Sequence, residues 1–215
     1  CRASKMSSTE EVLDSPSFKK WFKGSKVVDK QGKPLVVYHG TRFKFPYFSE
    51  ETANWFSDDP SFASNFADFS PGNLLFSKGE LAGNVYPVYV NIKNPLDFSK
   101  VFTDVRQKLT KKGFERGLKE IIGKDNNLSI ALDDAIEYAN SSSDENINIH
   151  DSFAMDYSDM FAEPGNTLNN WAKNSGYDGL IVPEDTGEKI INTYVAFEPT
   201  QVKSVFNKGT FNPND

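Results

Sequence analysis

Apolar residues follow two different spacings along the chain, and together they predict short helices and short strands. Near the N-terminal end, Phe18, Trp21 and Phe22 keep the three- and four-residue spacing of one helical face, and Gly24 ends that helix. Further along, short continuous apolar blocks lie between turn residues such as Gly, Pro and Asn, which is typical of buried strands. The predicted strands cover residues 35–38, 55–56, 85–92, 179–182, 192–197 and 202–205.

A second helix follows the strand at residues 55–56. Either Asp58 or Asp59 can cap its N-terminus, because a carboxylate there accepts hydrogen bonds from unpaired backbone N–H groups. Pro60 suits the first turn, where its missing N–H has no consequence. The pattern predicts one apolar face for this helix, formed by Phe62, Ala63, Phe66 and Ala67.

Residues 97–162 are richer in charge and helical in tendency, and we expect a helical insertion at about 98–165. Val101, Val105 and Leu109 keep a helical spacing of four. His150 also lies here, and we expect it to be a surface or capping histidine rather than a catalytic one. The whole chain is therefore predicted to be one domain, 1–215, with this insertion.

The composition narrows the class of protein. With 215 residues, 38% hydrophobic and 25% charged, the chain is long enough for a sizeable core and is not of the disordered class. The net charge of −6 argues against a nucleic-acid backbone as the main partner, and no apolar run has the length of a membrane span. Cys1 is the single cysteine, so an internal disulfide and a cysteine metal site are excluded. Because residue 1 is not Met, we expect a fragment or a processed product.

Several common catalytic motifs are missing from the sequence. It has no phosphate-binding P-loop, no dinucleotide-binding glycine motif, no zinc-protease motif, no Cys/His cluster and no serine-hydrolase elbow. What remains is a spaced set of polar and aromatic residues. His39, Gly40 and Thr41 follow the first strand, and we expect them at its end, where Gly40 lets another group approach the backbone closely. The other members are Trp55-Phe56-Ser57 with Phe66, the Gly176–Asp178 turn, and the run from Thr193 to Val202.

This ordered set resembles the ADP-ribosyltransferases of the diphtheria-toxin and poly(ADP-ribose) polymerase type, and most closely their phage-borne and bacterial polyvalent-protein branch. The resemblance runs from about Phe18 to the C-terminus, and the region from about 98 to 165 contributes little to it. It implies an α+β fold in which two small, mainly antiparallel sheets pack near-orthogonally around a cleft for NAD. NAD would be the cosubstrate, and no metal is expected.

The resemblance also implies roles for individual residues. His39 would hydrogen-bond the adenosine-side ribose, and the Gly40 backbone would pair with the nicotinamide carboxamide. Trp55 and Phe66 match two aromatic residues eleven positions apart that stack on the nicotinamide ring. A plain core phenylalanine remains an equal alternative for Phe66. The remaining positions of the implied NAD site are Thr41, supporting the ribose, Ser57, which matches the small residue beside the carboxamide, and Phe56.

The expected catalytic glutamate is replaced. Thr193 stands at the position where the family has this glutamate, and a hydroxyl cannot stabilise the positive charge that develops on the ribose when the glycosidic bond breaks. A carboxylate could come instead from Glu184 or Glu188 in the polar loop at 183–189, although a solvated loop is the more ordinary interpretation of both.

The expected function is NAD-dependent mono-ADP-ribosylation of a macromolecule. A host protein is the expected target, and a nucleic acid is the less favoured one. The chain would act in the bacterial host cytoplasm, expressed by a phage or delivered as a toxin-like effector. Two alternatives stay open, a weakened NAD- or ligand-binding module and an NAD glycohydrolase.

Overall fold

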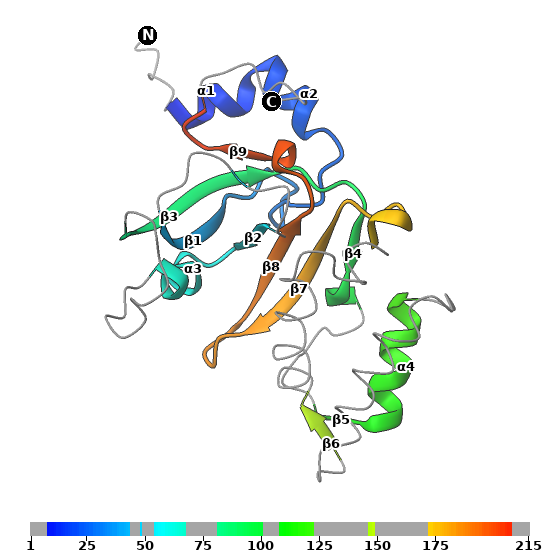
Figure 1. Cartoon of the computed structure of the whole chain (residues 1–215). Helices are drawn as coiled ribbons and strands as arrows, with labels where there is room; N and C mark the ends of the chain where they lie inside the picture. Colours follow the sequence, from blue (N-terminus) through cyan, green and yellow to red (C-terminus); the bar gives the residue numbers. More distant parts are fainter. Residues whose placement is uncertain are drawn as a thin grey trace.

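Seven strands form one curled, mixed sheet at the centre of the structure, in the order β4-β7-β8-β2-β1-β3-β9 (Figure 1). This computed structural model describes residues 8–43, 48, 54–67, 81–100, 108–122, 146–148 and 172–207. Only β4 and β7 run parallel, and the other neighbouring strands pair antiparallel. The strands are β1 (Val37–Phe43), β2 (Asn54–Ser57), β3 (Leu81–Val90), β4 (Pro95–Asp97), β7 (Gly179–Asp185), β8 (Ile190–Ala196) and β9 (Val202–Ser204).

The mixture of helices and strands is confirmed, but the main sheet is continuous where the sequence predicted two sheets. The short strand β2 makes the connection. It pairs with β8 from Asn54↔Ala196 to Ser57↔Thr193, and with β1 at Tyr38↔Ser57. Since β1 is otherwise paired with β3, the two halves of the sheet meet at a very short ladder between β1 and β2.

Strand β1 is longer than its apolar block. It continues to Phe43, because its backbone pairs with β3 from Val37↔Val88 to Phe43↔Leu81. His39, Gly40 and Thr41 therefore lie inside the strand, and the prediction that they stand at its end is wrong. The side chains from Val37 to Thr41 alternate in direction along the strand, so neighbouring members of this trio face opposite sides of the sheet.

The N-terminal region contains two helices instead of one, α1 (Ser8–Asp14) and α2 (Pro16–Phe22). They separate at Ser15, whose Oγ accepts a hydrogen bond from the Phe18 N–H at 3.2 Å and caps α2. The predicted face is confirmed: Phe18, Trp21 and Phe22 are buried around Tyr89 of β3. Figure 1 shows both helices beside β9, at the β3–β9 edge of the sheet.

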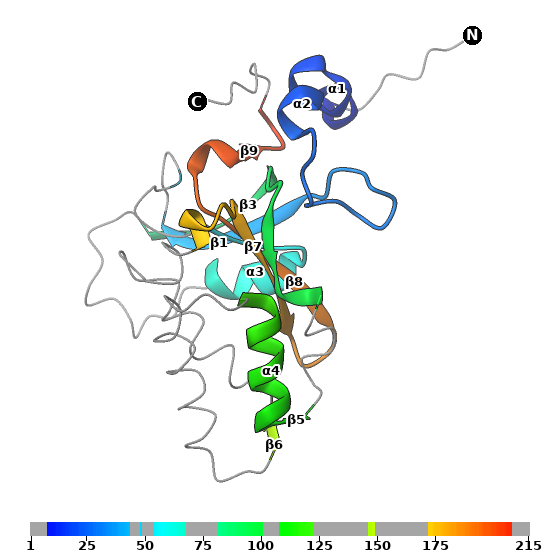
Figure 2. The same cartoon turned by 90° about the vertical axis from the view of Figure 1, so that its right-hand side faces the viewer.

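The described part of the insertion contains β5 (Lys108–Thr110), α4 (Lys111–Ile122) and β6 (Asn146–Asn148), and Figure 2 shows α4 next to β5 and β6. Helical structure is confirmed at α4. Leu109 lies in β5 and not in a helix, because it pairs with Ile147. Val101, Val105 and His150 lie outside the described residues. None of the described helices has the length and apolar character of a membrane span.

Candidate active site

Strand alternation divides the predicted site residues between the two faces of the sheet. Tyr38, Ser57 and Thr193 stand opposite one another on neighbouring strands, so their side chains share one face. Helix α3 (Pro60–Ala67) packs on this face against β1 and β3, and we call it the α3 face. The opposite, core face carries His39 and Phe56, next to the buried cluster that contains Val37 and Tyr194.

Close packing against Gly40 fixes the position of α3. A Cβ at residue 40 would lie 1.7 Å from the carbonyl oxygen of Ala63, and a Cβ at Gly83 would lie 2.4 Å from that of Ala67. Only glycine permits the helix backbone to lie this near the strands. The sequence predicted a close approach to the backbone at Gly40, and in the structure the group that comes close is the backbone of α3.

The same packing determines where Phe66 lies. Its Cβ would be 3.3 Å from a Cβ at residue 40, so the side chain starts beside Gly40. Ala63 and Ala67 are buried, whereas Phe66 is 56% exposed and meets Phe62 edge-on. The predicted apolar face is thus carried by the two alanines, and the interpretation of Phe66 as a core residue is wrong.

His39 connects β1 to β2 close to the short ladder between them. Its Nδ1 lies 2.8 Å from the carbonyl oxygen of Trp55. A carbonyl can only accept, so Nδ1 carries the proton and Nε2 is the acceptor nitrogen of the neutral ring. Burial lowers the pKa of His39, partly opposed by the hydrogen bond to Trp55, and this keeps the ring neutral at pH 7. Phe48 and Phe56 pack around the imidazole, with ring centroids 5.3 and 5.7 Å away.

Thr193 is buried on β8, opposite Ser57 on one side and Val182 on the other. Its Oγ1 lies 3.2 Å from the carbonyl oxygen of Val182 and 3.4 Å from Oε1 of Glu184. Glu184 is two residues beyond Val182 on β7, so it shares the α3 face with Thr193.

The loop predicted at 183–189 is shorter than expected. Strand β7 continues to Asp185, so the hairpin turn consists of Thr186–Lys189, with Gly187 at φ +85°. The ladder between β7 and β8 places Glu184 within the sheet, opposite Ile191. Glu188 is exposed in the turn. The two glutamates therefore occupy quite different environments.

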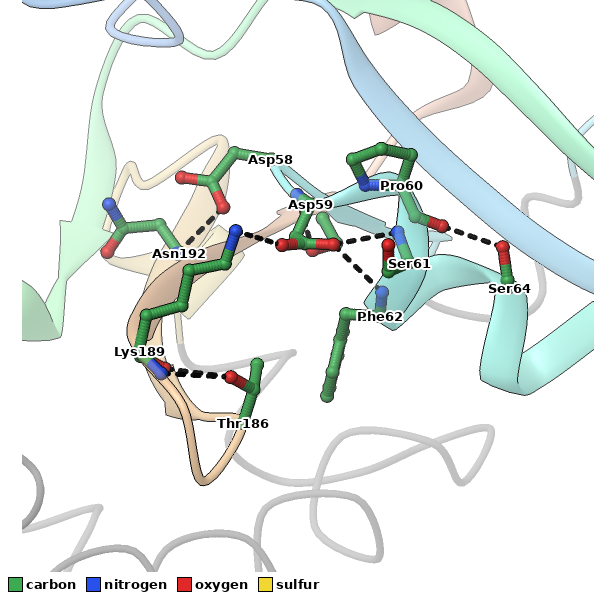
Figure 3. Close-up of polar contacts among 10 residues, drawn as sticks. Asp58, Asp59, Pro60, Ser61, Phe62, Ser64, Thr186, Lys189 and Asn192 are labelled. Atoms are coloured by element: carbon green, nitrogen blue, oxygen red, sulfur yellow. Dashed lines mark hydrogen bonds and ion pairs between the residues drawn. The ribbon is translucent and has the colours of Figure 1, made fainter.

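Asp59 is the cap of α3 and also contacts the hairpin (Figure 3). Its Oδ1 accepts hydrogen bonds from the N–H groups of Ser61 and Phe62, at 2.7 and 3.0 Å, and its Oδ2 forms an ion pair with Lys189. The Lys189 hydrogen bond, followed by that from Phe62, lowers the pKa of Asp59. Ser57 Oγ accepts the Asp59 N–H at 3.0 Å.

Asp58 extends the ladder between β2 and β8. Its N–H donates to Asn192 O at 3.1 Å, and its Oδ1 accepts from Asn192 N–H at 3.2 Å. Burial raises the pKa of Asp58, opposed by this hydrogen bond from Asn192.

The sequence analysis did not identify Lys189 as part of the site. Its ion pair with Asp59 joins positions 130 residues apart, and no local pattern signals it.

The structure thus brings Gly40, Trp55 and Phe66 together on the α3 face where β1, β2 and α3 meet, and it places Ser57, Thr193 and Glu184 on the same face of the adjoining strands. His39 lies on the opposite, core face, where its Nδ1 contacts the carbonyl oxygen of Trp55. The other predicted residues of the set lie within the sheet: Phe56 is 2% exposed in the core, and Thr41 pairs with Asn84 of β3. Among the described residues, no three His, Cys, Asp or Glu side chains are grouped as metal ligands.

A family model described as "ADP-Ribosyltransferase in polyvalent proteins" matches residues 29–211. No curated protein and no solved structure matches the chain. The match includes every strand of the main sheet, helix α3 and all of the candidate site residues. The chain therefore belongs to the ADP-ribosyltransferases of polyvalent proteins, whose family reaction is the NAD-dependent transfer of ADP-ribose.

Proposed function

We propose that the chain is a mono-ADP-ribosyltransferase that binds NAD where β1, β2 and α3 meet and modifies a protein of the bacterial host. The observation that carries this proposal is the convergence of Gly40, Trp55 and Phe66 from three separate elements on the α3 face, with His39 hydrogen-bonded to the Trp55 backbone from the core face. These are the positions at which the family resemblance expects contacts to NAD, and family membership makes NAD the cosubstrate.

The nicotinamide ring would stack against Trp55 and Phe66. Trp55 is half-buried on the α3 face, and Phe66 exposes more than half of its surface beside Gly40. A planar aromatic surface holds a flat ring and removes water from one side of it. The Gly40 backbone would orient the carboxamide. The pairing between β1 and β2 lies at Tyr38 and Ser57 and does not extend to Gly40.

His39 would hold a ribose hydroxyl through Nε2 on the core side of the short β1–β2 ladder, while the nicotinamide lies on the α3 side. The Trp55 carbonyl fixes the ring orientation and the tautomer, and burial keeps the ring neutral, so the acceptor is prepared before NAD arrives. Such preorganisation lowers the entropic cost of placing the reacting bond.

Thr193 restricts the product. Extending a chain of ADP-ribose requires a base for the ribose hydroxyl of the growing end, and a threonine hydroxyl does not supply one at neutral pH. We therefore expect the transfer of single units. The same residue favours two weaker candidates, an NAD glycohydrolase that uses water as acceptor and a binding module without turnover.

One experiment separates the three candidates. The purified chain is incubated with NAD labelled in the adenylate part, with and without lysate of a bacterial host. Label on a protein band supports the transferase, and free ADP-ribose in both samples supports the glycohydrolase. Intact NAD in both samples refutes catalysis and leaves the binding module.

A further inference from the structure

We propose that Glu184 supplies, from the neighbouring strand, the carboxylate that Thr193 lacks. The inference rests on the proposed function and names the residue that makes bond cleavage possible there. Glu184 Oε1 lies 3.4 Å from Thr193 Oγ1, across the β7–β8 ladder. The carboxylate that the family resemblance expects on β8 would thus come from β7, beside Thr193 on the α3 face.

The register explains why the replacement is possible. Val182 is directly opposite Thr193, and Glu184 is the next residue of β7 whose side chain points to the same face. A glutamate side chain is long enough to cross this diagonal. Its carboxylate then stands beside Thr193, whose other neighbour, Ser57, continues into the strand that carries Trp55.

The other described acids of the hairpin and of the β2–α3 turn have different positions or partners. Glu188 is exposed in the turn, and Asp185 Oδ1 accepts the Gly187 N–H at 2.8 Å. Asp59 caps α3 and pairs with Lys189. Asp58 accepts the Asn192 N–H and stands near Tyr194 of the core face, whose pKa is raised by burial and then by the charge of Asp58.

The burial of Glu184 suits an electrostatic role. It is half-buried, and the threonine that it contacts is 4% exposed, so bulk water screens the carboxylate less than it screens Glu188. A fixed charge in such a place stabilises a developing charge of opposite sign without reorganising solvent.

The reaction can be written with its atoms balanced. The bond between the ribose C1′ and the nicotinamide nitrogen breaks, and its electron pair leaves with neutral nicotinamide. Glu184 stabilises the positive charge that forms on the ribose, and it accepts a hydrogen bond from a hydroxyl of that sugar. A nucleophile of the target then forms the new bond at C1′ and releases its proton to the solvent.

The ion pair between Asp59 and Lys189 supports this geometry. Lys189 is the last residue of the turn in the hairpin that carries Glu184 and Thr193, and Asp59 caps the helix that carries Phe66 (Figure 3). The ion pair therefore connects the hairpin of Glu184 and Thr193 to the helix of Phe66.

The test compares Glu184→Gln with Glu188→Gln, an identical change four residues along the same hairpin. Nicotinamide release from NAD gives turnover, calorimetry gives the affinities for NAD and for free nicotinamide, and thermal melts check folding. We expect Glu184→Gln to lower turnover about a hundredfold with unchanged nicotinamide affinity. Glu188→Gln should keep the wild-type rate, because its side chain is exposed in the turn.

A second variant tests the same idea in the other direction. Thr193→Glu in the Glu184→Gln background returns a carboxylate to the family position, and turnover should recover at least tenfold. If this double variant does not fold, the comparison of Glu184→Gln with Glu188→Gln still decides whether Glu184 takes part in turnover. Equal turnover of Glu184→Gln and wild type overturns the role of Glu184.

Failure of the proposed function would look different. A wild-type chain that binds NAD and leaves it intact refutes the transfer reaction itself. Glu184 is then judged by affinity: if Glu184→Gln weakens NAD binding but not nicotinamide binding, its place at the ribose is retained. If both affinities stay at the wild-type value, Glu184 is removed from the site.

Discussion

Replacing Gly40 by alanine tests whether the glycine exists for helix packing. In the wild-type backbone the new methyl carbon would lie 1.7 Å from Ala63 O and 2.7 Å from Ala63 C. Ordinary van der Waals contact begins at 3.4 Å. The obstacle is helix backbone and not a flexible side chain, so α3 and β1 must separate by roughly the difference between these distances, more than 1 Å.

We expect this displacement to reduce both stability and binding. Overpacking a close contact costs about 1–3 kcal/mol, and a clash with backbone belongs at the upper end of that range. For a domain of this size, about 3 kcal/mol corresponds to a fall of roughly 6–12 °C in Tm. Phe66 moves with the helix, and a shift of about 1 Å can cost a hundredfold in rate when it misplaces the reacting groups.

Two glycines provide graded controls in thermal melts and in NAD calorimetry. Gly83→Ala places a methyl carbon 2.4 Å from Ala67 O on the same helix and should lower Tm less than Gly40→Ala. Gly32→Ala meets nothing within 4 Å, so its cost comes only from its φ of +77° and should leave NAD binding unchanged. A Gly40→Ala protein that melts with the wild type, or above Gly83→Ala, would refute the packing explanation.

Three further predictions concern the site. Calorimetry on His39→Ala should show about a tenfold loss of NAD affinity, the value of one hydrogen bond, and an unchanged affinity would remove His39 from the site. Lys189→Met should lower the free energy of unfolding, measured in urea, more at pH 7 than at pH 2. In the wild type the lowered pKa of Asp59 stabilises the fold above the unfolded pKa of 3.8. This stabilisation is lost as the pH falls through the lower pKa of the folded state. A difference that does not change with pH would contradict this linkage. Mass spectrometry of the modified target should show single ADP-ribose units, and repeating units would exclude the limit that we assign to Thr193.

Local patterns in the sequence were sufficient for several elements. The spacing of Phe18, Trp21 and Phe22 predicted the buried face of α2, and the apolar block at 192–197 predicted most of β8. The acid and proline at 59–60 predicted the start of α3. In each case the signal lies within a few residues, because helix capping and strand alternation are local properties of the chain.

The position of the proposed NAD residues could be read only in part. Trp55 and Phe66 were singled out by their spacing, but the pattern put Phe66 on the same buried face of α3 as Ala63 and Ala67. Ala63 and Ala67 are the packed residues because two glycines on β1 and β3 admit the helix backbone, and these glycines come from strands that are far apart in the sequence. Phe66 is exposed as a consequence.

What the sequence determined by itself is the family, the aromatic and histidine positions, and the absence of a glutamate at residue 193. Tertiary structure decided the continuous sheet, the place of His39 inside β1, and the positions of Glu184 within the sheet and of Glu188 in the turn. The physical reason is register. Which residues face each other across β7, β8, β2 and β1 depends on backbone pairing between distant segments, and a shift of one residue would move Glu184 to the opposite face.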